Sequence, residues 1–262
     1  MTDGGLPQAS RSMPGLVAQG RWPGAAQEAG ESADWRTRGD LVTERSNRHT
    51  TERLRRYWDK HSNSYDRDMA FLERVLFEDG RQWVCSQVTG DVLEIAVGTG
   101  RNLPFFPPEV HLTGVEFSPA MLDLARQRAQ TLGRQVDLRL GDAQALDLPD
   151  AAFDTVVCTL SLCGIPDERR AVAEMMRVLR PGGRLLLLDH IAGSAAWVRA
   201  IQWLLERITI PLGEEHFLRR PLQTVQAEGF VVEVSQRSKL GIVERLVAHK
   251  PADTQTTFAA ER

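Results

Sequence analysis

Cysteine is scarce in this chain of 262 residues, and its three cysteines exclude a fold built on disulfides. Small secreted domains rely on several paired cysteines, whereas Cys85, Cys158 and Cys163 are too few for such a framework. None of them has the CxxC spacing, or histidines at the distances, that a zinc site uses. We therefore expect no metal site and a reducing, cytoplasmic location.

The sequence also lacks long apolar runs and an excess of positive charge. Its longest apolar runs, such as residues 185–188, are far shorter than the roughly 20 residues of a membrane-spanning helix. The N-terminus lacks the basic-then-apolar order of a secretory signal. The formal net charge is −3, whereas a protein that binds duplex nucleic acid usually has a clear basic excess. These absences predict a soluble protein that does not bind nucleic acid.

Three segments differ in composition. Residues 1–45 are rich in Gly, Pro, Ala, Gln and Ser with little apolar periodicity, so we expect a disordered N-terminal extension. Residues 46–250 should form one domain, followed by a flexible tail at residues 251–262. Residues 36–60 hold eight basic and four acidic side chains, a pattern more typical of a solvated helix face than of a contact with anionic lipid.

Between residues 46 and 250, short apolar segments alternate with amphipathic ones. Such alternation is typical of βαβ units in a parallel sheet that is buried on both faces. We expect helices near residues 51–57, 69–87, 119–131, 168–179 and 220–228, and strands at residues 92–95, 111–115, 136–140, 155–159, 184–188, 230–235 and 242–248. The predicted fold class is α/β: a Rossmann-like, seven-stranded, mostly parallel sheet with helices on both faces and an antiparallel closing strand.

The most informative stretch is residues 92–100, Val-Leu-Glu-Ile-Ala-Val-Gly-Thr-Gly. It predicts a buried strand that ends in a glycine-rich turn, with a helix after it. Gly98 and Gly100 carry no Cβ, so a nucleotide-like ligand can approach the backbone closely. Glu116 ends the next strand, where a carboxylate can accept hydrogen bonds from a ribose diol. The pattern indicates a cofactor with a nucleoside part.

Two cofactor interpretations compete at this turn. The dinucleotide fingerprint G-x-G-x-x-G, begun at Gly98, needs a third glycine at position 103, where it allows close helix–strand packing. Leu103 stands there instead, which weakens the NAD interpretation without excluding it. Begun at Glu94, the spacing E-x-A-x-G-x-G resembles the acidic residue and glycine loop of class I S-adenosylmethionine-dependent methyltransferases.

Four further segments resemble motifs of that family, in the family's order. They are residues 114–122 (Gly-Val-Glu-Phe-Ser-Pro-Ala-Met-Leu), 141–143 (Gly-Asp-Ala), 153–157 (Phe-Asp-Thr-Val-Val) and 178–184 (Val-Leu-Arg-Pro-Gly-Gly-Arg). One motif alone would be weak, whereas five in register are specific. The resemblance covers about residues 55–248 and implies S-adenosyl-L-methionine as the cofactor.

Two other segments resemble narrower branches of the family. Residues 156–163, Val-Val-Cys-Thr-Leu-Ser-Leu-Cys, are similar to the methyltransferase-like-7 group of alkyl thiol S-methyltransferases. Residues 58–66, Trp-Asp-Lys-His-Ser-Asn-Ser-Tyr-Asp, resemble the segment that caps the cofactor in the quinone-methylating branch. Some bacterial quinone and phospholipid methyltransferases share much of the remaining pattern. The methyltransferase-like-7 proteins carry an apolar N-terminal membrane anchor, which this sequence does not show.

The resemblance implies roles for individual residues. Glu94 would meet the amino group of the methionine moiety, Glu116 the ribose hydroxyls and Asp142 the adenine amino group, while Phe117 and Met121 pack on the adenine. Simpler alternatives are a capping carboxylate for Glu94, a turn-forming role for Asp142 and a core role for Met121. The expected cofactor-binding set is Tyr65, Glu94, Ala96, Gly98, Gly100, Asn102, Leu103, Glu116, Phe117, Met121, Asp142, Ala143, Thr159 and Leu160.

Ala96 departs from the family pattern, because it occupies the place of the first glycine of the loop. An alanine at positive φ is strained by roughly 1–2 kcal/mol. We therefore predict a negative φ at Ala96, and a positive value would contradict the register assigned to the loop.

The acceptor should be bound by residues 158–163 and 190–220. His190 follows the fifth strand, at the rim where open α/β sheets bind ligands, and is either an acid–base catalyst or a structural histidine. Cys163, Trp197 and His216 are the candidates for the substrate pocket, and Cys158 is expected to be an apolar wall residue. The aromatic, apolar character of residues 190–220 favours a lipophilic acceptor.

The sequence thus predicts methyl transfer from S-adenosylmethionine to a small or lipophilic acceptor, with a thiol as the first candidate. A quinone or a phospholipid headgroup is the alternative acceptor. An alternative of another class is a non-catalytic module that binds S-adenosylmethionine and regulates, and an NAD-dependent oxidoreductase is a third. We expect no metal and no covalent enzyme intermediate. The expected assembly is a monomer or homodimer, without an integral membrane segment but with peripheral membrane contact left open.

Overall fold

The computed structural model describes residues 38–252, with side chains from residue 50 onward. All strands of the sheet lie in the part of the described chain that follows residue 42. Most of the extension predicted at residues 1–45 lies outside the described residues. Its last part differs from the expectation, because helix α1 (Arg38–Leu72) already begins at Arg38. Nearly all of the predicted tail at residues 251–262 also lies outside.

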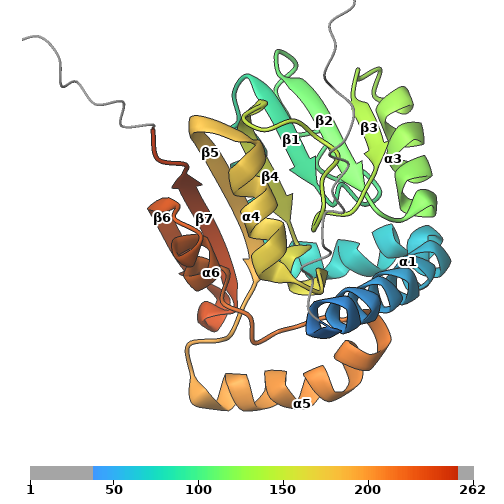
Figure 1. The fold of residues 1–262 in the computed structure, drawn as a ribbon, viewed down its shortest axis with the longest axis vertical. Helices are drawn as coiled ribbons and strands as arrows, with labels where there is room; N and C mark the ends of the chain where they lie inside the picture. Colours follow the sequence, from blue (N-terminus) through green and yellow to red (C-terminus); the bar gives the residue numbers. More distant parts are fainter. Residues whose placement is uncertain (1–37, 253–262) are drawn as a thin grey trace, which may run out of the picture. The chain divides into compact units, whose positions relative to one another are not determined.

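A seven-stranded sheet has the order β3-β2-β1-β4-β5-β7-β6 (Figure 1). Strands β1 to β5 are parallel, whereas β7 runs antiparallel to both of its neighbours, β5 and β6. The bounds are β1 Asp91–Ile95, β2 His111–Glu116, β3 Asp137–Leu140, β4 Phe153–Thr159, β5 Leu179–His190, β6 Val231–Ser238 and β7 Val243–His249. The predicted fold class, including its antiparallel closing strand, is confirmed.

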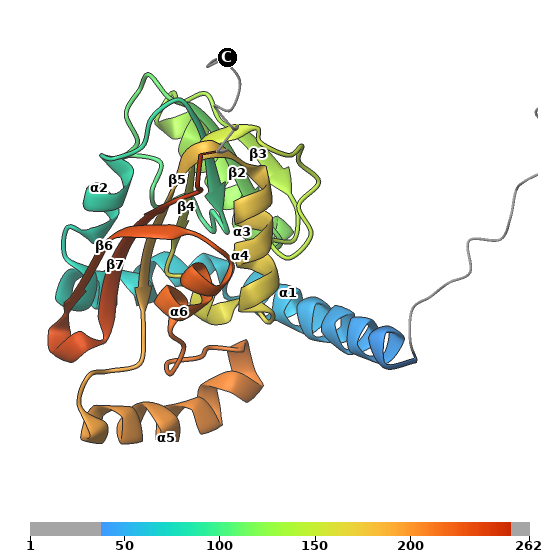
Figure 2. The ribbon, with the colours of Figure 1, turned by 60° about the vertical axis from the view of Figure 1, so that its left-hand side comes forward.

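The alternation of side chains along the central strands builds a core on each face of the sheet. Leu93 of β1 and Leu187 of β5 belong to one buried cluster, whereas Val92 and Leu186 belong to the other. Helix α4 (Glu168–Val178) covers the first cluster and α2 (Gly80–Cys85) covers the second, on opposite faces of the sheet (Figure 2). Helix α3 (Pro119–Thr131) begins where predicted, because the Ser118 side chain accepts a hydrogen bond from the backbone of Met121.

The N-terminal helices differ from the prediction of two separate segments. α1 runs unbroken to Leu72, a π-helical turn covers Glu73–Phe77, and α2 begins at Gly80. The reason is that residues 50–79 contain neither glycine nor proline to end the helix. α1 and α5 (Ala196–Gly213) lie at the carboxyl ends of the parallel strands, and α6 (Pro221–Ala227) follows α5 (Figures 1 and 2). Within residues 38–252, none of the helices combines the length and apolar character needed to cross a membrane.

Candidate functional site

A cavity of about 500 Å³ lies at the carboxyl ends of the parallel strands, between α1 and α5. Open α/β sheets bind their ligands at this edge. The loops after β1, β2, β3 and β4 contribute to its wall, as does His190 at the end of β5. Among the residues proposed from the sequence, the lining includes Tyr65, Ala96, Gly98, Glu116, Phe117, Met121, Asp142, Ala143, Leu160, Cys163 and His190.

The loop after β1 is tight and depends on its two glycines. Gly98 and Gly100 both have positive φ, and a Cβ on Gly100 would lie 2.8 Å from Leu103 Cδ1 and 3.2 Å from Ala125 Cα. Gly98, by contrast, has only one atom within 4 Å of an added Cβ, the carbonyl oxygen of Ala96 at 4.0 Å. The backbone of Gly98 therefore borders open space in the cavity, so that a nucleoside could approach it closely.

The helix expected directly after this turn is absent from residues 97–110. These residues form turns and bends instead. The reason is local, because Pro104, Pro107 and Pro108 interrupt a helical hydrogen-bond pattern within four residues of one another. Gly100 and Leu103 consequently shape the loop from behind the cavity rather than from its lining, and Leu103 is fully buried.

The prediction for Ala96 was wrong, because its φ is 53°. Ala96 keeps the left-handed backbone that glycine favours at this place, with a strain of roughly 1–2 kcal/mol. The register of the loop nevertheless stands on other contacts. Glu94 pairs with Gly114 inside the sheet, and the Gly98 N–H donates to Glu116 Oε2 at 2.9 Å. Alanine therefore tolerates a positive φ at this position. The assumption that it would not was wrong, whereas the register of the loop is unaffected.

Glu116 lies at the end of β2 with its carboxylate in the cavity wall. The backbone N–H of Gly98 donates to Oε2 and that of Ser118 donates to Oε1, each at 2.9 Å. Burial raises the pKa of Glu116 to about 7, and these backbone donors offset part of the effect. Two fixed donors orient both oxygens while leaving each with a free lone pair, which is the arrangement that a vicinal diol can use.

Glu94 lies behind the cavity, fully buried and only partly satisfied. Its Oε1 accepts a hydrogen bond from Asn102 Nδ2 at 2.8 Å, whereas Oε2 has no partner among the described residues. Burial raises the pKa of Glu94 to about 8, although Arg81 and Asn102 oppose the shift. A buried carboxylate oxygen without a partner is costly, and a cationic amino group would satisfy it. This free acceptor, directly behind the cavity wall, is compatible with the role that the family resemblance implies for Glu94 toward an amino group.

Asn102 joins Glu94 to two other elements. Its Nδ2 also donates to Thr159 Oγ1 at 2.8 Å, and its Oδ1 accepts from Arg81 Nη1 at 2.8 Å. Arg81 of α2 also reaches Thr159 Oγ1 at 3.1 Å. Asn102 and Thr159 thus hold Glu94 in place from outside the cavity lining. Sequence reasoning missed Arg81, because nothing near it in the chain indicates this long-range network.

Asp142 has the turn-forming role considered for it, and its adenine role stays a prediction. Its Oδ1 accepts the Gln144 backbone N–H at 2.9 Å, and the Gln144 side chain donates to both carboxylate oxygens at 3.0 and 3.2 Å. The turn-forming role is therefore present. Asp142 also lines the cavity beside Ala143, and its Oδ2, which accepts only the longer of the two side-chain bonds, retains a lone pair for a ligand amino group.

Helix α1 covers the cofactor end of the cavity through two aspartates. Asp59 accepts from Ser118 Oγ at 2.6 Å and from the Ala120 N–H at 3.2 Å, at the start of α3. Asp66 accepts from Thr99 Oγ1 at 2.6 Å and pairs with Arg128. Between them Tyr65 points into the cavity wall, where burial raises its pKa to about 12. The sequence motif containing Tyr65 suggested a cap, but not these partners.

A partly buried ion-pair cluster fixes the π-helical turn that follows α1. Glu73 accepts from Arg101 Nη2 at 2.7 Å and from Arg81 Nη2 at 2.6 Å. Burial would raise the pKa of Glu73, but the two guanidinium groups hold it below the ordinary value. The cap and the glycine loop are therefore joined by charge pairs as well as by hydrogen bonds.

The opposite end of the cavity carries His190. Its ring stacks on Phe217 with centroids 4.8 Å apart, and neither ring nitrogen has a hydrogen-bond partner among residues 50–252. Glu215, which sequence reasoning missed, lines the same cavity. Burial raises the pKa of Glu215, whereas the nearby His190 opposes the shift. A histidine with both nitrogens free inside a cavity can exchange a proton with a ligand.

Cys163 and Asp189 lie beside His190, with one ligand atom from each of the three residues within 4.8 Å of the others. Asp189 already accepts the Cys163 N–H at 3.1 Å and the His190 N–H at 2.8 Å. Asp189 is thus better described as a residue that holds these two backbone segments together than as a metal ligand. Burial also raises the pKa values of the Cys158 and Cys163 thiols well above normal, so neither is a reactive thiolate.

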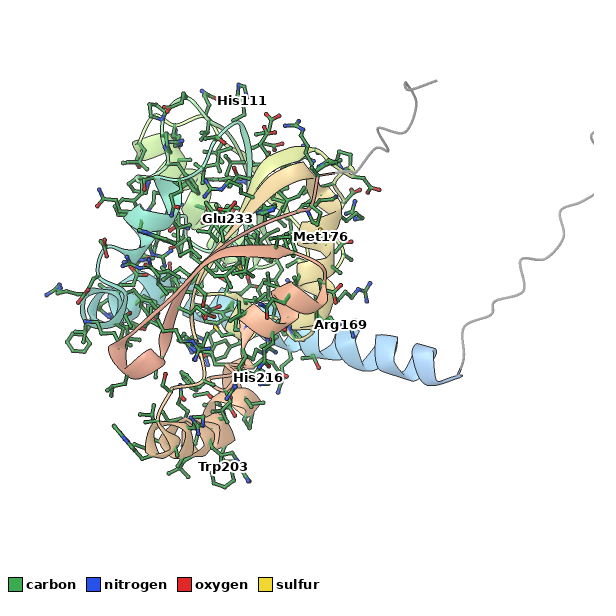
Figure 3. The ribbon with its side chains drawn as sticks, turned by 90° about the vertical axis from the view of Figure 1, so that its left-hand side faces the viewer. His111, Arg169, Met176, Trp203, His216 and Glu233 are labelled. Carbon is green, nitrogen blue, oxygen red and sulfur yellow. The ribbon has the colours of Figure 1, made fainter. Side chains whose placement is uncertain are left out.

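Trp197 and His216 do not line the cavity, contrary to expectation. The phase of α5 explains Trp197, because Val198, Ile201, Gln202 and Leu205 occupy the inward side at helical spacing and leave Trp197 exposed. His216 lies just behind the wall, in the turn that follows α5 (Figure 3), and its backbone N–H donates to the Cys163 carbonyl at 3.1 Å.

Comparison with known proteins agrees with this geometry. Residues 93–187 match a family described as a methyltransferase domain. A phosphatidylethanolamine N-methyltransferase of Cereibacter sphaeroides is 40% identical over 126 residues, which are 47% of this chain and 62% of that protein. A demethylmenaquinone methyltransferase of Deinococcus radiodurans is 45% identical over 101 residues, 37% of this chain and 42% of that protein. A human thiol S-methyltransferase is 31% identical over 137 residues, 50% of this chain and 55% of that protein.

The chain therefore spans between 42% and 62% of the length of these relatives. Among solved structures, an S-adenosylmethionine-dependent methyltransferase from Thermotoga maritima shares the fold with a TM-score of 0.59 and 22% identity, covering 75% of this chain and 99% of that one. A 4+2 cyclase also shares it, with a TM-score of 0.56 and 21% identity, covering 66% of this chain and 79% of that one. Such distant likenesses establish the fold alone. The matched domain and the relatives identify residues 93–187 as a methyltransferase domain, and the fold is the one that S-adenosylmethionine-dependent methyltransferases share.

Proposed function

We propose that this protein is an active methyltransferase that modifies a lipophilic acceptor with an ionisable proton, a thiol in the first instance. The observation that carries the proposal is the composition of a single cavity. Glu116 and Asp142 line one end of it, whereas His190 and the apolar inner side of α5 line the other. A cofactor at the first end and an apolar acceptor at the second would therefore share one cavity, as direct transfer requires.

The residues would divide the work as follows. Glu116 would accept hydrogen bonds from the ribose hydroxyls, Asp142 from the adenine amino group, and Glu94 from the amino group of the methionine moiety. When bound, S-adenosylmethionine supplies a methyl group made electrophilic by its sulfonium. α1 excludes water from this end of the cavity through Asp59 and Asp66.

At the other end, the protein must align the acceptor and take its proton. Ile201 and Phe217 offer apolar contacts to an alkyl or aromatic acceptor. His190 would accept the thiol proton at a free ring nitrogen, and the adjacent Glu215 would stabilise the imidazolium that results. The buried thiols of Cys158 and Cys163 take no part in this step.

The relatives favour two further acceptors. A quinol or the amine of a phospholipid headgroup also loses a proton during methylation, and proteins with those names match this chain at 45% and 40% identity. A cyclase shares the fold, so the fold alone does not imply methyl transfer. A non-catalytic module that binds S-adenosylmethionine is therefore kept as the alternative of another class. The expected cytoplasmic location and the monomeric or dimeric state also remain predictions.

Transfer of a labelled methyl group to a panel of acceptors tests the proposal. We expect an alkyl thiol to be methylated faster than a quinol or phosphatidylethanolamine, with the product identified by mass. Faster methylation of the quinol or the phospholipid would replace the thiol assignment. Tight binding of S-adenosylhomocysteine without turnover on any acceptor would favour the regulatory module instead.

A further inference from the structure

Helix α5 is apolar on the side that faces away from the sheet as well as on its inner side. Five large apolar side chains outside the cavity lining are exposed on it, and Trp203 points away from the sheet (Figure 3). They are Trp197, Trp203, Leu204, Ile208 and Leu212. Soluble monomers rarely expose so many large apolar groups together, so this face is expected to contact another apolar phase.

At 100° per residue, Trp197, Leu204, Ile208 and Leu212 form one strip along α5, whereas Trp203 lies with the three charged residues beside that strip. All three charged residues are engaged locally. Arg199 donates to the carbonyls of Gly193 and Ser194, and Glu206 accepts the Leu218 N–H. The Arg207 guanidinium lies over the Trp203 ring, 4.3 Å from its centroid. An indole beside a guanidinium suits a lipid headgroup region, where the ring meets acyl chains and the cation meets phosphate.

The exposed face is continuous with the cavity. Ile201 and Leu205 line the cavity, yet they are 52% and 44% exposed. On the other side of the opening, Leu72 also lines the cavity and is exposed, and its neighbours Phe71 and Val75 are exposed as well. An unbroken apolar surface therefore leads from outside the molecule to the acceptor end of the site.

We propose that the exposed apolar strip of α5 docks on the surface of a lipid bilayer, with Trp197 on the strip and the Trp203–Arg207 pair beside it toward the headgroups. A lipophilic acceptor then enters from the bilayer between α5 and the end of α1. A second copy seated on α5 would instead cover this opening, which is why the bilayer is the favoured occupant. The entry route rests on the proposed function, whereas the docking itself does not.

Sedimentation of the full chain with vesicles tests the docking. We expect it to bind phosphatidylcholine vesicles, and more strongly when phosphatidylglycerol is included, since Arg207 is then near anionic phosphate. The double variant Leu204→Gln/Ile208→Gln should partition about tenfold more weakly, because two aliphatic side chains lose their apolar contact. A matched double variant of exposed aliphatic residues elsewhere, Leu132→Gln/Val231→Gln, should partition like the unmodified chain.

Two other readouts separate the possible failures. None of the four substituted residues lines the cavity, so S-adenosylhomocysteine affinity and methyl transfer to a short, water-soluble acceptor should not change. Equal vesicle binding by both double variants, or no vesicle binding at all, would overturn the docking proposal. A dimer that the α5 variant dissociates in light scattering would also overturn it, in favour of a second copy. Vesicle binding that depends on α5, without transfer to any acceptor, would refute the proposed function while leaving the docking intact.

Discussion

Binding of the cofactor should release a proton from Glu94. In the free protein burial raises the pKa of Glu94 to about 8, so at neutral pH the side chain is mostly protonated. A cationic amino group beside the unpartnered Oε2 stabilises the carboxylate and lowers this pKa. Each binding event then releases close to one proton, and the affinity for S-adenosylhomocysteine rises up to about tenfold per pH unit between roughly pH 6 and 8.

The same shift acts in the opposite direction on the stability of the free protein. The folded state holds the Glu94 proton more tightly than the unfolded state, whose pKa is the model-peptide value of 4.5. This contribution is fully present below about pH 4.5 and is lost as the pH rises through about 8. The melting temperature of the free protein should therefore fall over this range, while the increase caused by S-adenosylhomocysteine should grow.

Calorimetry in buffers of different ionisation enthalpy measures the released proton directly. Glu94→Gln should abolish the release and flatten the pH dependence. Glu168→Gln is the matched control, because burial also raises the pKa of Glu168, which lies outside the cavity lining. The reasoning would be refuted if the Glu94 variant released as many protons as the control, or if the unmodified protein released none.

Three further predictions concern other parts of the site. Glu116→Ala should weaken S-adenosylhomocysteine binding by about 100-fold or more without unfolding the protein, since two hydrogen bonds to a charged group are lost; unchanged affinity in calorimetry would contradict the ribose assignment. Ala96→Gly should raise the free energy of unfolding in urea by about 1 kcal/mol by relieving the strain at φ 53°, whereas Ala129→Gly inside α3 should lower it by about as much. A loss of stability in Ala96→Gly would show that no strain exists. His190→Asn should slow transfer to a thiol by about 100-fold or more and flatten its pH–rate profile at unchanged S-adenosylhomocysteine affinity; an unchanged rate would leave His190 a structural role.

The sheet could be predicted because its information is local. Strands such as residues 92–95 are short, apolar and bounded by turn residues, and α3 is marked by a serine cap followed by Pro119. The family motifs then ordered the strands. The length of α1 was missed, although the absence of glycine and proline between residues 50 and 79 was a visible signal.

The site was predicted less evenly, because its geometry depends on contacts between distant segments. Glu116 lies in the cavity as expected, since a strand end fixes its position. Arg81 and Glu215 could not be found, because their partners come from other elements and leave no local pattern. The side of α5 that lines the cavity could have been predicted, since Val198, Ile201 and Leu205 recur at helical spacing. Trp197 was predicted instead because it is aromatic.

The position of α5 has a consequence for how this fold can acquire new substrates. The match to the methyltransferase family ends at residue 187, before His190 and the whole of α5. Helix α5 also lies outside the sheet, so none of the pairing between the seven strands depends on it. Substitutions along α5 can therefore change the apolar end of the cavity without altering the end lined by Glu116 and Asp142. The choice of acceptor could therefore change through substitutions in α5 while the matched domain, residues 93–187, stays the same.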